Sequence, residues 1–317
     1  MISRLLKTVL RPVLKISAIR QLLVRYHYRQ VIGPAERVME YRKDTNSLDD
    51  SYWVGLLRKH AHIVDKGLHC MDFERGRGQT AFQAAQQALS QIRSEASRAD
   101  PSVVWAIQKL KDYEKIQQSG ERYPSSPFVR TTCSYDHLLD VIHTRRSVRW
   151  YRPQSVSDDV IYKIVDVINW SPTSCNRQTA KVFATTDPVM AQKCIELCSG
   201  SSGFSRYVPL FIAFSSDIRV YEMAHEVMLP YIDVALGVQN CCLVAHTLGL
   251  SLTLLTWAQH TDDQDQQLRR ILSIPDHYQI IVNAAGGYPI GSAHPPSRKN
   301  LNETLILHKT KQGDKEK

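Results

Sequence analysis

The chain has 317 residues, of which 43% are hydrophobic and 22% are charged, as in a globular protein with a substantial core. Its net charge is +9, but residues 1–29 hold seven basic residues and no acidic one, which leaves about +2 for the rest. A nucleic-acid-binding protein would carry basic residues over its whole body, so this class is disfavoured. The seven cysteines include no CxxC pair, which argues against disulfides or a metal site and favours a cytoplasmic protein.

Residues 1–30 form a basic arm with the periodicity of an amphipathic helix. A helical projection gathers four cations on one side and apolar residues on the other; the cations are Arg4, Lys7, Arg11 and Lys15. This pattern is typical of a helix lying on an anionic membrane surface, although Pro12 would kink it. An arm packed on the protein, or a disordered basic tail, fits the sequence equally well. The arm therefore leaves two locations open, the cytoplasm at large and the inner face of the membrane.

Residues 31–125 are predicted to be an all-helical extension. Apolar spacing and helix-forming composition indicate three helices, at residues 49–68, 80–92 and 103–116. A stretch containing two prolines, at residues 120–127, follows them and reads as a linker. We place the domain boundary there.

Residues 126–308 have a mixed pattern, and a charged tail follows at residues 309–317. Ser157 can cap a helix that Pro172 would stop. Further helices are expected at residues 231–248, ended by Gly249, and at residues 261–272. Strands are expected at residues 181–186, 208–214, 252–256 and 279–285. The predicted fold class is α+β, a sheet flanked by helices on both sides.

Two polar segments of this region could bind a cofactor. The arginine segment (residues 145–149) contains Arg145, Arg146, Ser147 and Arg149, which can surround a phosphate with charge-assisted hydrogen bonds. The serine-rich loop (residues 171–178) clusters hydroxyls and amides of Thr173, Ser174, Asn176 and Gln178, with Pro172 among them. These groups could bind the polar edge of a heteroaromatic ring. A solvated basic face and an ordinary turn are the respective alternatives.

A third segment lies near the C-terminal end. Gly286 and Gly287 allow close backbone approach, and Arg298 and Lys299 could add charge to a phosphate site. The alternative is a basic surface loop.

The order and spacing of these features resemble the nitroreductase family of flavoproteins, over residues 145–304. An Arg-Arg-Ser-x-Arg start is followed by Ser-Pro-x-Ser-x-Asn-x-Gln, a long apolar helix ending Leu-Gly-Leu, Gly-Tyr-Pro and finally Arg-Lys. Two departures stand out. Gln178-Thr179-Ala180 replaces the usual Gln-Pro-Trp, and Ser251 stands where the family run Leu-Gly-Leu-Gly-Thr has its second glycine.

The resemblance implies an FMN-binding domain at residues 126–308 that works as a homodimer. Arg145, Arg146, Ser147 and Arg149, helped by Arg298 and Lys299, would hold the FMN phosphate and ribityl chain. Pro172, Thr173, Ser174 and Asn176 would meet the flavin of the partner subunit, and Gln178 would lie nearby. The flavin ring would lie beside Leu255, Thr256 and Trp257. The helix at residues 231–248 would form much of the dimer interface.

The implied activity is that of an FMN-dependent oxidoreductase. NADH or NADPH would reduce the flavin, and a small acceptor would then take the hydride in a ping-pong sequence. Candidate acceptors are a nitroaromatic, a quinone, free flavin or a biosynthetic intermediate. The flavin carries the chemistry, so no catalytic residue is expected from the protein.

The N-terminal half carries a weaker resemblance. His62-Ile63-Val64-Asp65-Lys66-Gly67-Leu68 is similar to a His-x-x-Glu-Lys-Gly-Leu segment of nitroreductase-like proteins from bacterial polysaccharide gene clusters. It suggests an alternative function, a weakly active or non-catalytic flavin-binding accessory protein of a membrane-associated polysaccharide biosynthesis system.

Overall fold

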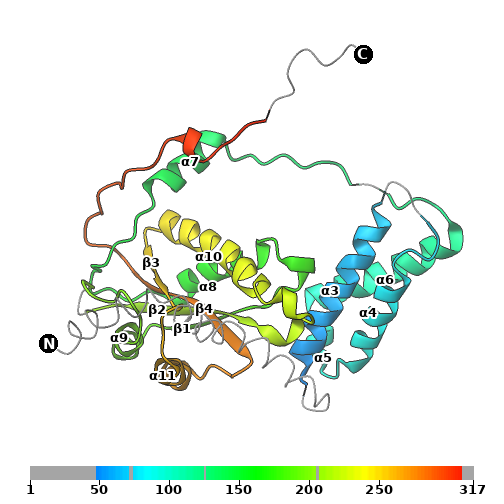
Figure 1. Ribbon diagram of the computed structural model, residues 1–317, viewed down its shortest axis with the longest axis horizontal. Coiled ribbons are helices and arrows are strands. Elements are labelled where there is room, and N and C mark those ends of the chain that lie inside the picture. Colours follow the sequence, from blue (N-terminus) through cyan, green and yellow to red (C-terminus); the bar gives the residue numbers. More distant parts are fainter. Residues whose placement is uncertain (1–47, 71–73, 125, 205–206, 309–317) are drawn as a thin grey trace, which may run out of the picture.

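The structure, a computed structural model, describes residues 48–308 except 71–73, 125 and 205–206. The predicted basic arm and charged tail therefore lie outside the described residues. Figure 1 shows a group of helices on one side of the molecule and a sheet with its own helices on the other. We call them the helical region (residues 48–119) and the mixed region (residues 126–308). The fold class is α+β, as predicted.

The helical region consists of α3 (Asp50–Leu68), α4 (Gln79–Gln91), the short α5 (Glu95–Arg98) and α6 (Pro101–Ser119). The three predicted helices are confirmed within three residues at each end. Their ends follow from local chemistry: the Asp49 carboxylate accepts from the Tyr52 amide at the start of α3, and Gly120 takes φ 72° after α6. The inward faces form one apolar core, whose fully buried members include Leu57, Ala61, Val64, Ala85, Ile92 and Val103.

The mixed region is built on a four-stranded sheet. The strands are β1 (Ala180–Thr185), β2 (Leu210–Asp217), β3 (Ser251–Thr256) and β4 (Tyr278–Gly287), in the order β1-β2-β4-β3. Every neighbouring pair is antiparallel. All eight residues of β2 are buried, because this inner strand is covered on both faces.

Helices cover both faces of the sheet, as Figure 1 shows. On one face α8 (Asp158–Asp166), the 3-10 turn η2 (Val167–Trp170) and α10 (Leu229–Thr247) pack on Leu210, Ile212 and Phe214 of β2. On the other face α9 (Pro188–Glu196) and α11 (Asp262–Leu272) pack on Phe211 and Ala213. The strand alternates between two apolar cores, as a pleated strand between two helix layers must.

Some local predictions need correction. Ser157 occupies the N-cap position of α8, but its side chain makes no capping hydrogen bond. The helix gives way to η2 at Asp166, before Pro172 is reached, because the chain tightens into a 3-10 turn. The sequence analysis did not predict α7 (Tyr135–Thr144), although Ser134 caps it; the helix buries no residue in this chain. Gly249 follows α10 with φ 77°, as expected for a helix end.

The two regions pack directly against each other through α3. Val220 of the mixed region is 1% exposed and belongs to the core of the helical region. A side chain at Gly55 of α3 would come within 2.8 Å of it, so this approach requires glycine. An ion pair of 3.1 Å joins Arg219 to Asp49, and a second joins Lys59 to Glu222. Among the described residues no helix has the length and apolar character needed to cross a bilayer.

Candidate functional site

The backbone of the arginine segment is fastened to the edge of the sheet by two hydroxyl groups of β3. The Ser251 hydroxyl accepts from the Val148 amide at 3.0 Å and donates to the Arg146 carbonyl at 2.9 Å. The Thr253 hydroxyl donates to the Val148 carbonyl at 2.8 Å. Ser251, which differs from the glycine of the family sequence, thus fixes the segment together with Thr253.

The arginine side chains themselves remain available to an anion. Arg145 and Arg146 are half-buried, Arg149 is exposed, and Ser147 lies among them. The Arg146 guanidinium donates to the Arg145 carbonyl, and the Arg149 guanidinium lies 5.8 Å from the centre of the Phe204 ring. Within the described residues none of the three guanidinium groups pairs with a carboxylate. Three cations without acidic partners on one fixed backbone fit a phosphate group.

The end of β4, with Gly286 and Gly287, runs into a segment that lies beside residues 150–152, directly after the arginine segment. The Arg152 amide donates to the Tyr288 carbonyl at 2.8 Å, and the Ile290 amide donates to the Trp150 carbonyl at 2.9 Å. The glycines serve this packing: a side chain at Gly286 would lie 2.5 Å from the Leu252 side chain. Close approach is therefore required by the protein itself at this position.

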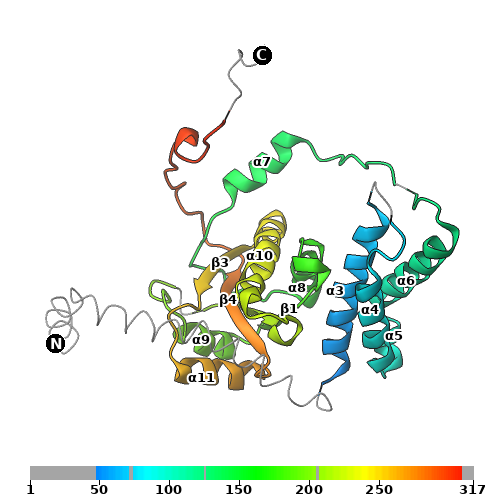
Figure 2. The same cartoon turned by 45° about the vertical axis from the view of Figure 1, so that its right-hand side comes forward.

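Arg298 and Lys299 lie apart from these contacts. Both are exposed, and the chain beyond β4 leaves the sheet on the side to which α7 projects (Figures 1 and 2). The guanidinium of Arg298 donates to the Ser297 carbonyl, and the ammonium of Lys299 donates to the Glu303 carbonyl. In the described part of the chain neither forms a hydrogen bond or ion pair with residues 145–149.

The serine-rich loop adopts a strained backbone. Cys175, Asn176 and Gln178 have φ values of 52°, 53° and 51°, in the left-handed region that non-glycine residues seldom adopt. Such conformations persist only where the surroundings enforce them, and they cluster at functional sites. Pro172 is exposed, and the side chains of Thr173 to Asn176 are half-buried. The side-chain amide of Gln178 donates from Nε2 to the Asn176 side-chain oxygen at 3.1 Å.

Two buried charged residues hold this loop. The Asp233 carboxylate of α10 accepts from both the amide and the hydroxyl of Ser174, at 3.0 and 2.8 Å. Arg177, only 1% exposed, donates to the Ser174 carbonyl at 3.1 Å and pairs with Glu226 at 2.5 Å. Burial opposes ionisation of Glu226, but the Arg177 charge and two backbone amides outweigh it and lower the pKa of the carboxyl.

The sequence reasoning did not identify Arg177, Glu226 or Thr253 as supporting residues. It gave no supporting role to Asp233, which lies on the helix predicted at residues 231–248. No motif signals these residues, because each acts through a partner far away in the sequence. Ser251 alone had a signal, namely its departure from the family pattern.

The residues predicted to lie beside the flavin ring, at positions 255–257, are mostly buried. Leu255 and Trp257 are 4% and 2% exposed, and their side chains belong to the apolar core beneath α9 and α11. The Trp257 indole donates to the Asp265 carboxylate at 3.0 Å. Only Thr256 of this group is exposed. In this chain, therefore, Thr256 alone offers a side chain to a ligand, and the other two offer only backbone.

The arginine segment and the serine-rich loop lie at opposite ends of α10. Thr144, just before the arginines, hydrogen-bonds His246 near the C-terminal end of α10 at 2.8 Å. Ser174 of the loop is held by Asp233 near its N-terminal end. Thirteen residues of helix at 1.5 Å each separate these attachment points by about 20 Å. One chain alone does not bring the two segments together.

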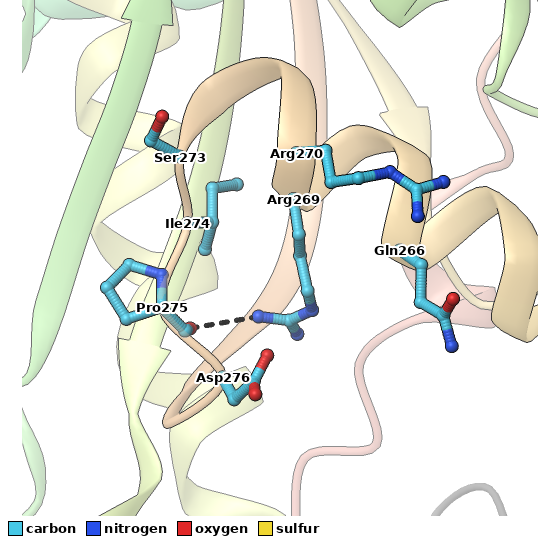
Figure 3. Close-up of a pocket in the computed structure, with 7 residues that line it drawn as sticks. All are labelled: Gln266, Arg269, Arg270, Ser273, Ile274, Pro275 and Asp276. Carbon is cyan, nitrogen blue, oxygen red and sulfur yellow. Dashed lines mark hydrogen bonds between the residues drawn. The ribbon is translucent and has the colours of Figure 1, made fainter.

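A separate surface hollow of about 330 Å³ lies where α11 joins β4. Figure 3 shows Arg269 directed into the connecting loop and Arg270 pointing away from it. Arg269 pairs with Asp265 at 2.5 Å and donates to the Pro275 and Tyr278 carbonyls, both at 3.0 Å. These contacts fasten the loop to the start of β4. None of the predicted site residues lines this hollow.

Comparisons with known proteins point to one family. Residues 142–201 match the model of the nitroreductase family. A protein of Methanothermobacter thermautotrophicus, named NADH dehydrogenase/NAD(P)H nitroreductase, is 26% identical over 171 residues, which is 54% of this chain and 85% of that protein. An FMN reductase (NADPH) of Bacillus subtilis is 22% identical over 169 residues, 49% of this chain and 66% of that protein.

Solved structures were compared as well. An FMN-dependent nitroreductase from Clostridium difficile superposes with a TM-score of 0.46 and 19% identity, covering 54% of this chain and 99% of that one. The resemblance to the nitroreductase family is confirmed for residues 142–201. The origin in a polysaccharide gene cluster stays a prediction.

Proposed function

We propose that the mixed region, which contains the nitroreductase-family segment, binds FMN and acts as an NAD(P)H-dependent oxidoreductase. The observation that carries this proposal is a set of three guanidinium groups on a fixed backbone, with no carboxylate partner among the described residues. They belong to Arg145, Arg146 and Arg149. They would bind the FMN phosphate, with the Ser147 hydroxyl as a further donor. The names of the similar proteins, an NAD(P)H nitroreductase and an FMN reductase, support the same activity.

We further propose that the flavin site is completed by a second copy of the chain. If two α10 helices pack antiparallel, the serine-rich loop of one subunit comes to the arginine segment of the other, which removes the separation of about 20 Å along α10. The outward face of α10 suits such a contact, because Ile232 and Leu236 are 51% and 45% exposed. They lie four residues apart and share one side of the helix.

Bound FMN would supply hydride-transfer chemistry between NADH or NADPH and a small acceptor, with donor and acceptor using the same space in turn. The arginine segment of the chain would supply the positive charge for the FMN phosphate. The serine-rich loop, fixed by Asp233 and Arg177, would contact the flavin of the partner subunit. Candidate acceptors are a nitroaromatic, a quinone, free flavin and a biosynthetic intermediate. In the described part of the chain Arg298 and Lys299 form no hydrogen bond or ion pair with the arginine segment, so we propose that they act across the dimer.

The direct test is an anaerobic titration of the purified protein with NADH and, separately, NADPH. We expect FMN to copurify or bind, its absorbance to bleach on reduction, and a nitroaromatic or menadione to restore it. Arg149→Gln should weaken FMN binding, whereas Lys163→Gln on α8 should not, because Lys163 only pairs with Asp159 on the helix surface. A purified protein that contains no FMN and binds none when FMN is added would overturn the proposal.

Two predictions on the N-terminal half remain proposals. We propose residues 31–125 and 126–308 as separate domains, although Val220 lies in the core of the helical region. We also propose peripheral membrane contact through residues 1–30, on the basis of their charge pattern alone. Pelleting with anionic vesicles, with and without residues 1–30, tests the second proposal.

The alternative function is that of a non-catalytic flavin-binding accessory protein. Bound flavin without steady-state oxidation of NADH or NADPH would favour it.

A further inference from the structure

A polar cavity of about 170 Å³ lies between the helical region and the edge of the sheet. Figure 2 shows α3 as the helix of the helical region that faces the mixed region, and Ser51, Gly55 and Arg58 of α3 line one side. Residues 177–181, from the end of the serine-rich loop into β1, line another. The cavity exists only where the two regions are packed together.

Three cationic side chains from three different elements line this cavity: Arg58 of α3, Arg177 of the serine-rich loop and Lys181 of β1. The one carboxylate in the lining, Asp217, is already engaged by Arg219, at 2.6 to 3.2 Å. The lining therefore offers an excess of positive charge and of hydrogen-bond donors.

Further acidic groups surround the cavity without lining it. Asp100 lies 3.5 Å from the Arg58 guanidinium, a long contact for an ion pair, and Glu226 pairs with Arg177. Lys181 has no ion-pair partner in the described part of the chain. The Nε of Arg58 donates to the Ser102 hydroxyl at 2.7 Å and its Nη2 faces Asp100, which leaves its Nη1 without a partner among the described residues.

Arg177 gives the sharpest indication of a missing acceptor. Its side chain is 99% buried, and its two terminal nitrogens are bonded to Ser174 and Glu226, yet its Nε has no acceptor among the described residues. Buried donors are nearly always satisfied, and a buried charged group without full hydrogen bonding is costly. Arg177 lines the cavity, and an oxygen atom that reaches this buried nitrogen from there would meet the requirement.

We propose that this cavity is a binding site for a small oxyanion, the phosphate or carboxylate group of a metabolite. The anion oxygens accept hydrogen bonds from Arg177 Nε, from the Arg58 guanidinium and from the Lys181 ammonium. The volume limits the ligand to a small group and excludes a nucleotide. None of its cations belongs to the arginine segment, but Arg177 and Gln178 come from the serine-rich loop, so the site is tested with FMN bound.

The test measures thermal unfolding of the full-length protein, with FMN added to saturation, at increasing inorganic phosphate and, separately, acetate. Ligand that binds only the folded protein raises its melting temperature with a concentration dependence set by its affinity. We expect such a rise, and Lys181→Gln should shift the phosphate dependence to concentrations at least about threefold higher, as expected for loss of one partly exposed ion pair. Lys163→Gln, an exposed lysine on α8, is the matched control and should leave it unchanged.

A comparison with Arg149→Gln locates the effect. If Arg149→Gln rather than Lys181→Gln weakens the response, phosphate binds at the arginine segment and the cavity proposal fails. It also fails if phosphate and acetate have no effect, or if a crystal grown with phosphate shows only water in the cavity. A stronger response to phosphate than to acetate would identify the phosphate group as the natural ligand, and the reverse would identify a carboxylate. Failure here leaves the FMN proposal untouched, because flavin binding is measured separately.

Discussion

Ser251→Ala is the substitution that most directly tests how the arginine segment is held. It removes one hydroxyl that accepts from the Val148 amide and donates to the Arg146 carbonyl. Val148 is 6% exposed, so water cannot readily replace the lost acceptor. Thr253 would remain as the only hydroxyl tie between β3 and the segment.

The magnitude follows from the buried amide. A buried donor left without an acceptor costs about 1 to 3 kcal/mol, and we expect the free energy of unfolding to fall by this amount. The arginine backbone also gains freedom. If this freedom costs one charge-assisted contact to the FMN phosphate, the dissociation constant of FMN rises about tenfold or more, since tenfold corresponds to about 1.4 kcal/mol.

The assay combines urea denaturation with fluorescence titration of FMN. Ser215→Ala is the matched control: its buried hydroxyl on β2 donates to the Lys181 carbonyl at 2.7 Å, remote in sequence from the arginines. It should lower stability by about 1 kcal/mol and leave the FMN affinity unchanged. If both variants weaken FMN binding equally, or neither does, Ser251 does not position the segment and the reasoning is refuted.

Three further predictions concern the loop, the helix layer and the dimer. Because the pKa of Glu226 is lowered in the folded state, this residue contributes stability that is fully present above its unfolded pKa, ordinarily near 4.5, and is lost as the pH falls through the lower folded value. Urea denaturation at several pH values should show this loss of stability in the wild type and a smaller loss in Glu226→Gln. The variant should also be less stable at neutral pH, because Arg177 loses its charge partner. Gly237→Ala should destabilise the fold by about 1 to 3 kcal/mol, since the new methyl group would overlap Ile168 of η2; a thermal melt equal to the wild type would contradict this packing. Ile232→Asp on the outer face of α10 should give a monomer in analytical ultracentrifugation that binds FMN weakly, whereas a stable dimer would refute the proposed interface.

Much of the fold could be predicted because its signals are local. Apolar spacing marked α3, α6, α10 and α11, and runs of β-branched and aromatic residues marked the strands, because each pattern reflects which side of an element meets a core. Gly249 marked the end of α10, and the structure adds a Thr261 capping box at the start of α11. By contrast, α7 was not predicted, although Ser134 caps it, and it buries nothing in its own chain.

The candidate site was only partly readable. The arginines and the polar loop could be found from their residue types and spacing, because phosphate recognition needs those groups close together in the chain. Leu255 and Trp257 were named as flavin neighbours, yet their side chains fill the core. A sequence motif marks a position without saying which way its side chain points.

The sequence by itself determined the fold class, the order of the elements and the two polar segments, because these depend on interactions between residues near one another in the chain. Only the tertiary structure decided how they are held and where they meet. Asp233 holds Ser174 across 59 residues of sequence, and Ser251 holds Val148 across 103. Such contacts depend on the distances that packing creates, and so does the separation of the two segments along α10. No local pattern of residues encodes a distance of that kind.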